Sequence, residues 1–128
     1  MINLIDAVDT LGTPRGHYSH AACAGNMVFL SGQLPITPAG KQLQDAPFEG
    51  QVLQVFENID TVLQSCGCTR RDLLQVRVYL TDIEQWPEFN RLYANWLGAH
   101  RPARSVVPVP ALHYGLALEV EATAVRAN

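Results

Sequence analysis

The residues best suited to chemistry lie near the C-terminus, in the run Arg101-Pro102-Ala103-Arg104-Ser105. An apolar segment follows directly, so Arg104 stands at the mouth of a predicted strand. A guanidinium presents a planar fork of donors that matches a carboxylate in bidentate geometry. Pro102 removes a backbone donor and stiffens the approach to Arg104. Arg104 is therefore a candidate carboxylate-binding residue, and the alternative is a structural ion pair at a strand end.

Length and composition limit the classes of protein to consider. The chain has 128 residues, of which 48% are hydrophobic and only 16% are charged. This length suits a single domain with one core, and the low charge content favours burial of surface between subunits. The formal net charge of −3 gives no electrostatic support for binding nucleic acid or an anionic membrane. No segment has the pattern of a signal peptide or a membrane span, so we expect a soluble, cytoplasmic protein.

Cysteine and histidine spacing gives little indication of a metal or a disulfide. Cys66-Gly67-Cys68 is not the Cys-x-x-Cys of redox and zinc sites, and with Cys23 the chain has an odd number of cysteines. Buried thiols in a reducing compartment are the simpler interpretation. His17 and His20 are three residues apart, which on a strand directs them to opposite faces. One packed and one exposed histidine is therefore favoured over a shared metal.

The elements that must position Arg104 follow from hydrophobic periodicity and from turn residues. Alternation predicts that Gln33 shares a face with Phe29, and Leu74 with Val76. Gly67 should end the first helix in the left-handed conformation. The predicted strands cover residues 2–5, 18–24, 27–33, 73–80, 104–109 and 116–125, and the predicted helices cover residues 48–66 and 86–97.

Two helices can cover one face of a five- or six-stranded mixed sheet, but not both faces. The last strand indicates what the second face contains, because it places small residues beside Glu119 and Glu121. Such a face is neither a solvated surface nor a full core. We therefore expect an oligomer with sites between its subunits. Glu121 is expected to form an interface salt bridge with Arg77 or Arg126.

Five short motifs occur in the order that is typical of the RidA (YjgF/UK114) family, and together they resemble it over residues 15–126. The resemblance implies one RidA-like domain over residues 1–128, with a chorismate-mutase-like α/β fold and a homotrimer with clefts between subunits. It also implies hydrolysis of reactive enamines and imines, such as 2-aminoacrylate, to 2-keto acids and ammonia without a metal or organic cofactor. The motifs are His17-Tyr18-Ser19, Ser31-Gly32-Gln33, Asn90-x-x-Tyr93, Pro102-Ala103-Arg104-Ser105 and Leu118-Glu119-Val120-Glu121.

The resemblance assigns roles to individual residues. Arg104 matches the arginine that binds the substrate carboxylate, and the backbone N–H of Val106 matches the second group that holds it. Glu119 matches the acid that orients the attacking water. Pocket residues of the same cleft are matched by Tyr18, Ser31, Gly32 and Asn90.

Departures from the family pattern bear on the substrate. His17 replaces a common proline, Val106 replaces a frequent cysteine, and residues 110–115 lack the common Leu-Pro-x-Asp turn. Two functions stay open: an imine/enamine deaminase, and a binding or regulatory module that senses a keto acid or related carboxylate. Both need Arg104. Glu119 favours the enzyme, because a pure carboxylate binder gains nothing from an acid beside its ligand.

Overall fold

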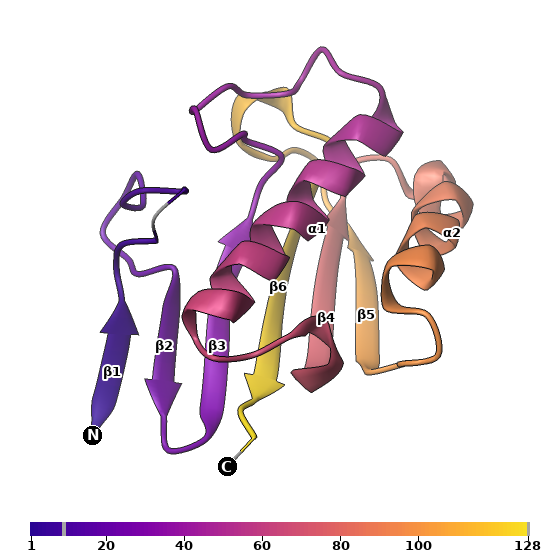
Figure 1. Cartoon of the computed structure of the whole chain (residues 1–128). Helices are drawn as coiled ribbons and strands as arrows, with labels where there is room; N and C mark the ends of the chain where they lie inside the picture. The colour runs from indigo at the N-terminus through magenta and orange to yellow at the C-terminus, as the bar shows by residue number, and fades with distance from the viewer. Residues whose placement is uncertain (9, 128) are drawn as a thin grey trace.

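The structure, a computed structural model, describes residues 1–8 and 10–127 (Figure 1). Within these residues the chain forms β1 (Ile2–Ile5), β2 (Ala21–Ala24), β3 (Met27–Gln33), α1 (Phe48–Ser65), β4 (Leu73–Leu80), α2 (Trp86–Leu97), β5 (Ala103–Pro108) and β6 (Leu118–Val125). The strands form one sheet in the order β1-β2-β3-β6-β4-β5, and only β4 and β5 pair in parallel. The predicted order of elements is confirmed.

Both helices form where apolar side chains recur every three or four residues and end where a glycine permits a left-handed turn. Gly67 follows α1 with a φ of +74°, and Gly98 follows α2 with a φ of +62°. The N–H of Cys68 donates to the carbonyl of Leu63 over 2.9 Å, as in a Schellman motif. Pro87 occupies the first turn of α2, where its missing donor costs no hydrogen bond.

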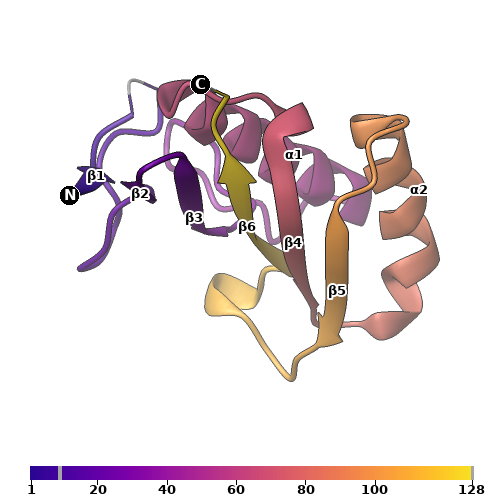
Figure 2. The ribbon, with the colours of Figure 1, turned by 90° about the horizontal axis from the view of Figure 1, so that it is seen from below.

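The core lies between the sheet and the two helices. Figure 2 shows both helices on one side of the sheet, and the described part of the chain places no α-helix on the other side. Phe56 of α1 stacks on Trp96 of α2 with ring centres 4.2 Å apart, which joins the helices above the sheet. The predicted single mixed sheet with two helices on one face is confirmed. The sheet residues buried under the helices include Val28, Leu30, Val76, Val78, Leu80, Leu118, Val120 and Ala122.

Two bulges change the side to which strand residues point. Leu30 pairs with Ala122 and Gln33 with Val120, so one extra residue of β3 bulges out between them. Gln33 is consequently buried on the helix side, and the prediction that it shares a face with Phe29 is wrong. A second irregularity, after Leu73 in β4, buries Leu73 and exposes its neighbour Leu74, again the reverse of the prediction.

Element boundaries otherwise differ little from those predicted. The second strand begins at Ala21 instead of residue 18, because the backbone bends where the N–H of Tyr18 donates to the carbonyl of Gly16. The last strand begins at Leu118 instead of residue 116. Shifts of this size are usual for element ends that are predicted from sequence.

The cysteines and histidines take the places expected of structural residues. All three cysteines are buried and unpaired, and burial raises the pKa of the Cys66 thiol to about 12. His20 is buried and donates from Nε2 to the carbonyl of Gly12 over 2.8 Å, whereas His17 is exposed. Within residues 1–8 and 10–127 no group of three ligating side chains suits a metal ion. No helix in that part of the chain has the length and hydropathy needed to cross a membrane. A cytoplasmic location stays a prediction.

Candidate active site

Arg104 lies on the face of the sheet that the helices cover. It stands opposite Val76, which pairs in turn with Ala122, and both neighbours are buried in the core. Residues paired directly across strands share a face, so the Arg104 side chain extends toward α2. Its Nη1 donates to Oδ1 of Asn90 over 2.9 Å, and its guanidinium carbon lies 4.8 Å from the centre of the Tyr93 ring. One hydrogen bond and one cation–π contact therefore fix the guanidinium.

The pocket around this guanidinium has a volume of about 440 Å³, and basic groups line it without an acid among the described residues. No carboxylate in residues 1–8 or 10–127 lies within 4.0 Å of Arg104. The buried hydroxyl of Tyr93 has no hydrogen-bond partner among the described residues, and burial raises its pKa to about 12. The described part of the chain thus gives Arg104 a neutral partner instead of the ion pair weighed from the sequence. Its remaining donors are left for a ligand.

Glu119 lies on the opposite, open face of the sheet. It pairs with Tyr79, which pairs with Val107 on β5, and this row of side chains is only partly buried. A cavity of about 570 Å³ opens beside it and brings four of the predicted site residues together. The described residues that line this Glu119 cavity are Arg15, Gly16, Tyr18, Ser31, Gly32, Leu34, Ile36, His113, Tyr114, Glu119 and Glu121.

Gly32 allows the Glu119 carboxylate to lie directly against the backbone of β3. A Cβ placed on Gly32 would lie 2.6 Å from Oε2 of Glu119, closer than non-bonded heavy atoms approach. The absence of a side chain here is therefore what leaves room for the carboxylate. Burial raises the pKa of Glu119, the charge of Glu121 raises it further, and His113 acts in the opposite sense. A carboxylate with a raised pKa is better matched to proton transfer near neutral pH.

Ser31 and Tyr18 also line the Glu119 cavity. The Ser31 hydroxyl donates to the carbonyl of Ser19 over 2.6 Å, which fastens the bulge of β3 to the N-terminal loop. The hydroxyl proton of Ser31 is therefore engaged within the chain. Tyr18 is 54% exposed. His17 lies outside this cavity, in a neighbouring hollow of about 630 Å³ that it shares with Phe29.

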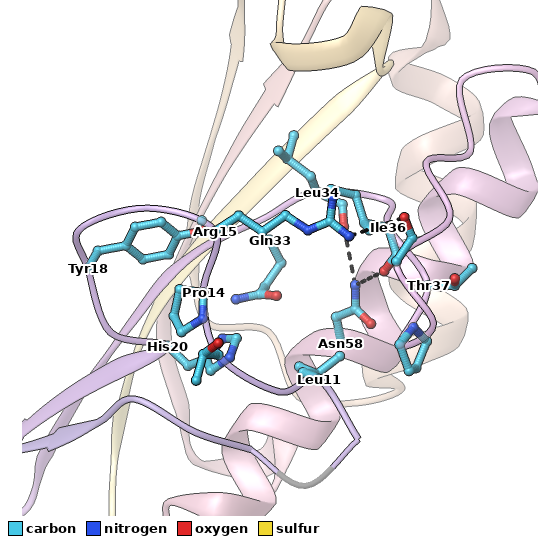
Figure 3. Close-up of a pocket in the computed structure, with 14 residues that line it drawn as sticks. Leu11, Pro14, Arg15, Tyr18, His20, Gln33, Leu34, Ile36, Thr37 and Asn58 are labelled. Atoms are coloured by element: carbon cyan, nitrogen blue, oxygen red, sulfur yellow. Dashed lines mark hydrogen bonds between the residues drawn. The ribbon is translucent and has the colours of Figure 1, made fainter.

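A smaller cavity of about 110 Å³ adjoins the Glu119 cavity and shares Arg15, Tyr18 and Gly32 with it (Figure 3). Asn58 of α1 closes its inner end. The Asn58 amide donates to the carbonyls of Leu34 and Ile36 over 3.2 and 3.0 Å. These hydrogen bonds hold the loop after β3 against α1, so one wall of the Glu119 cavity is supported from the core.

The predicted site residues therefore fall into two groups on opposite faces of the sheet. Arg104 of β5 and Asn90 of α2 line the pocket between those two elements, whereas Tyr18, Ser31, Gly32 and Glu119 line the Glu119 cavity. Val106 follows Arg104 on β5, and its side chain packs against the core. β5 is an edge strand, and alternate backbone N–H groups of an edge strand lack a partner within the sheet. A single copy of the chain does not bring Arg104 to Glu119.

Arg15, His113 and Tyr114 line the Glu119 cavity but were not predicted as site residues. Tyr114 has a φ of +61°, a left-handed conformation that is uncommon for a residue with a side chain. It belongs to the 3₁₀ turn His113–Gly115, which replaces the family's Leu-Pro-x-Asp turn. The absence of the family turn from residues 110–115 was the sequence feature that could have predicted this wall of the cavity. Nothing in the sequence marked Arg15 as a site residue except its position before Gly16.

Comparison with known proteins identifies the family. The family model described as Endoribonuclease L-PSP matches residues 10–126. Protein HMF1 of Saccharomyces cerevisiae is 41% identical over 107 residues, covering 84% of this chain and 82% of that protein. YyfA of Yersinia pestis, a protein of unknown function from the conserved Rid family, superposes with a TM-score of 0.91 at 31% identity, covering 98% of this chain and 99% of that one. Escherichia coli TdcF with bound serine gives a TM-score of 0.89 at 29% identity, with 98% and 100% covered. The chain belongs to the Rid (YjgF) family.

Proposed function

We propose that this protein hydrolyses imines and enamines of 2-keto acids, releasing the keto acid and ammonia, at a site that a second copy of the chain completes. The observation that supports the proposal is the set of contacts that Arg104 makes. Its guanidinium is held by the neutral oxygen of Asn90 and by the Tyr93 ring, without a carboxylate within 4.0 Å among the described residues. A positioned arginine with a neutral partner is suited to hold the carboxylate of a ligand.

Glu119 supplies the second requirement of the reaction, a group that handles protons beside a water molecule. In the proposed step, the oxygen of water bonds to the imine carbon while Glu119 accepts a proton from it. Glu119 passes that proton to the nitrogen, which gives the carbinolamine. The carbinolamine collapses to the ketone as Glu119 moves the hydroxyl proton to the nitrogen, the C–N bond breaks and ammonia leaves. An enamine must first take a proton on carbon to become the imine. The raised pKa of Glu119 supports this exchange of protons.

The open face of the sheet supports an assembly that joins the two halves. Phe29 is 49% exposed on that face, beside Ala22 and Thr123 in the same row across the sheet. Val107 of β5 is 39% exposed on the same face. Apolar side chains on a face without helices favour burial against another protein surface. We propose a homotrimer in which β5 of one copy places Arg104 at the Glu119 cavity of the next copy.

Two other functions are weighed against the deaminase. The serine bound to the Escherichia coli relative supports a ligand of amino-acid size with a carboxylate, which also fits a binding or regulatory module. The family description names an endoribonuclease, but a net charge of −3 gives no electrostatic support for binding RNA. The position of Glu119 beside a cavity favours an enzyme that hydrolyses its ligand over a protein that only senses it.

The test is release of keto acid and ammonia from 2-aminoacrylate generated enzymatically in the assay. The uncatalysed hydrolysis sets the baseline, and the Glu119→Gln variant at equal concentration is the matched control. We expect wild-type protein to accelerate keto-acid release and the variant to remain near the baseline. Equal rates with and without the wild-type protein would leave the binding module as the better account.

A further inference from the structure

Arg15 gives the Glu119 cavity an arginine of its own. It comes from the N-terminal loop and lines both the Glu119 cavity and the smaller cavity beside it. Figure 3 shows its side chain stretched across the smaller cavity toward the loop that contains Ile36 and Thr37. A cleft completed by Arg104 of a second copy would therefore contain two arginines, one from each copy.

The neighbouring loop at Gly40 holds the Arg15 guanidinium in place. Its Nη2 donates to the carbonyl of Gly40 over 3.2 Å. A Cβ on Gly40 would lie 2.5 Å from the same nitrogen, and the φ of +91° at Gly40 is one that residues with a side chain rarely adopt. Glycine at position 40 thus lets the guanidinium lie against the backbone.

This hydrogen bond leaves most of the Arg15 donors for another group. Arginine has five N–H donors, and no carboxylate in residues 1–8 or 10–127 lies within 4.0 Å of its guanidinium. Of the two acids that line the cavity, Glu121 is engaged by Tyr79 and Arg77. Glu119, the other acid, lies against Gly32 of β3, whereas the Arg15 guanidinium reaches the loop at Gly40.

We propose that Arg15 binds a second carboxylate on the substrate side chain, so that the cleft prefers imines of dicarboxylic amino acids to those of monocarboxylic ones. The proposal takes its substrate class from the proposed function: Arg104 holds the carboxylate next to the imine carbon, and Arg15 holds the one at the far end. The competing interpretation is that Arg15 only clamps the N-terminal loop to the loop at Gly40. A clamp would affect stability and would not distinguish between ligands.

The test compares two five-carbon keto acids, 2-oxoglutarate and 2-oxopentanoate, which differ by the second carboxylate. Their affinities are measured by calorimetry for wild type, Arg15→Gln and Arg15→Lys. Lys41→Gln is the matched control, because it removes the same charge from the residue after Gly40 without lining either cavity. Binding is measured because it does not require turnover. A failure of the deaminase proposal can therefore be distinguished from a failure of this one.

We expect wild type to bind 2-oxoglutarate roughly 10-fold to 100-fold more tightly than 2-oxopentanoate, the range for one charge-assisted contact. Arg15→Gln should abolish the preference while leaving 2-oxopentanoate binding within about 3-fold, and Arg15→Lys should retain part of it. Lys41→Gln should behave as wild type. A wild type with no preference, a preference that survives in Arg15→Gln, or binding of neither ligand would overturn the proposal. If Arg15→Gln does not fold, the proposal is tested by the preference of the wild type for 2-oxoglutarate and by the part of that preference that Arg15→Lys retains.

Discussion

The Arg104 pocket and the Glu119 cavity are built in different ways. The first is regular: a helix and an edge strand lie side by side, and Asn90, Tyr93 and Arg104 meet across them. The second is irregular, because a bulge, two loops and a left-handed turn bring Glu119 and Gly32 together. Regular elements hold a charged anchor with little freedom, whereas loops can vary in sequence and so can set the shape of the reacting end.

The two regions also face opposite sides of the sheet, and this difference bears on the assembly. The row through Arg104 and Val76 is buried under the helices, whereas the row through Glu119 and Tyr79 faces outward. In the proposed assembly, a ligand that touches both charged groups lies where two copies meet. Substitutions of Arg104 and of Glu119 therefore separate the anchor from the reacting end.

Removal of the anchor should have the largest effect. Arg104→Ala should lower kcat/KM for 2-aminoacrylate hydrolysis on the order of 10²-fold or more, because the carboxylate loses its partner and the imine carbon is misplaced. Arg104→Lys should recover only part, since an ammonium lacks the planar fork. Turnover and thermal midpoint are measured on the same preparation.

A different outcome would show that Arg104 has a structural role instead. The side chain contacts Asn90 and Tyr93, so some loss of stability is expected in the alanine variant. A variant with a lowered thermal midpoint but unchanged activity per folded protein would make Arg104 a structural residue. The carboxylate would then have to be held elsewhere.

At the reacting end, Glu119→Gln should lower kcat strongly while keto-acid affinity changes little, because the amide keeps the size and loses the proton exchange. The same change should raise the thermal midpoint at neutral pH. Folding raises the pKa of Glu119, so ionised Glu119 destabilises the folded state above that pKa. The stabilisation by glutamine should shrink as the pH falls through the raised pKa toward 4.5, the usual value for a glutamate. Full activity in the variant would show that another group activates water.

A smaller effect is expected for Gly32→Ala, since its Cβ would displace the Glu119 carboxylate without removing it. We expect kcat to fall roughly 10-fold, in line with misplacement of a positioned group. Gly50→Ala is the matched control, because the nearest atom to a Cβ there is 3.8 Å away, on Ala46. Unchanged kcat in Gly32→Ala, with normal kcat in the control, would mean that the carboxylate does not need this position.

Sequence patterns predicted the regular half of the molecule well. The periodicity of α1 and α2, Gly67 at the end of α1 and the order of the elements along the chain all follow from local features. The pairing of Arg104 with Asn90 is less obvious, but both residues belong to motifs of the family. Such features depend on the residue and its near neighbours, and that is why they can be read along the chain.

The irregular half could not be predicted in the same way. A bulge shifts every later side chain to the other face, so alternation failed at Gln33 and at Leu73. The role of Arg15 depends on a contact with Gly40, 25 residues away, which no local pattern records. The separation of Arg104 from Glu119 likewise follows from the register of three strands and not from either motif.

The most direct test of a site shared between copies is to mix two inactive variants, Arg104→Ala and Glu119→Gln. The subunits are exchanged by mild denaturation and refolding at equal concentrations. If each site takes Arg104 from one copy and Glu119 from the next, about a quarter of the sites in random ring-shaped oligomers should contain both native residues. Activity should therefore return to about a quarter of the wild-type value. If both residues act within one copy, mixing should restore nothing, and a mixture as inactive as its parents after verified exchange would contradict the account.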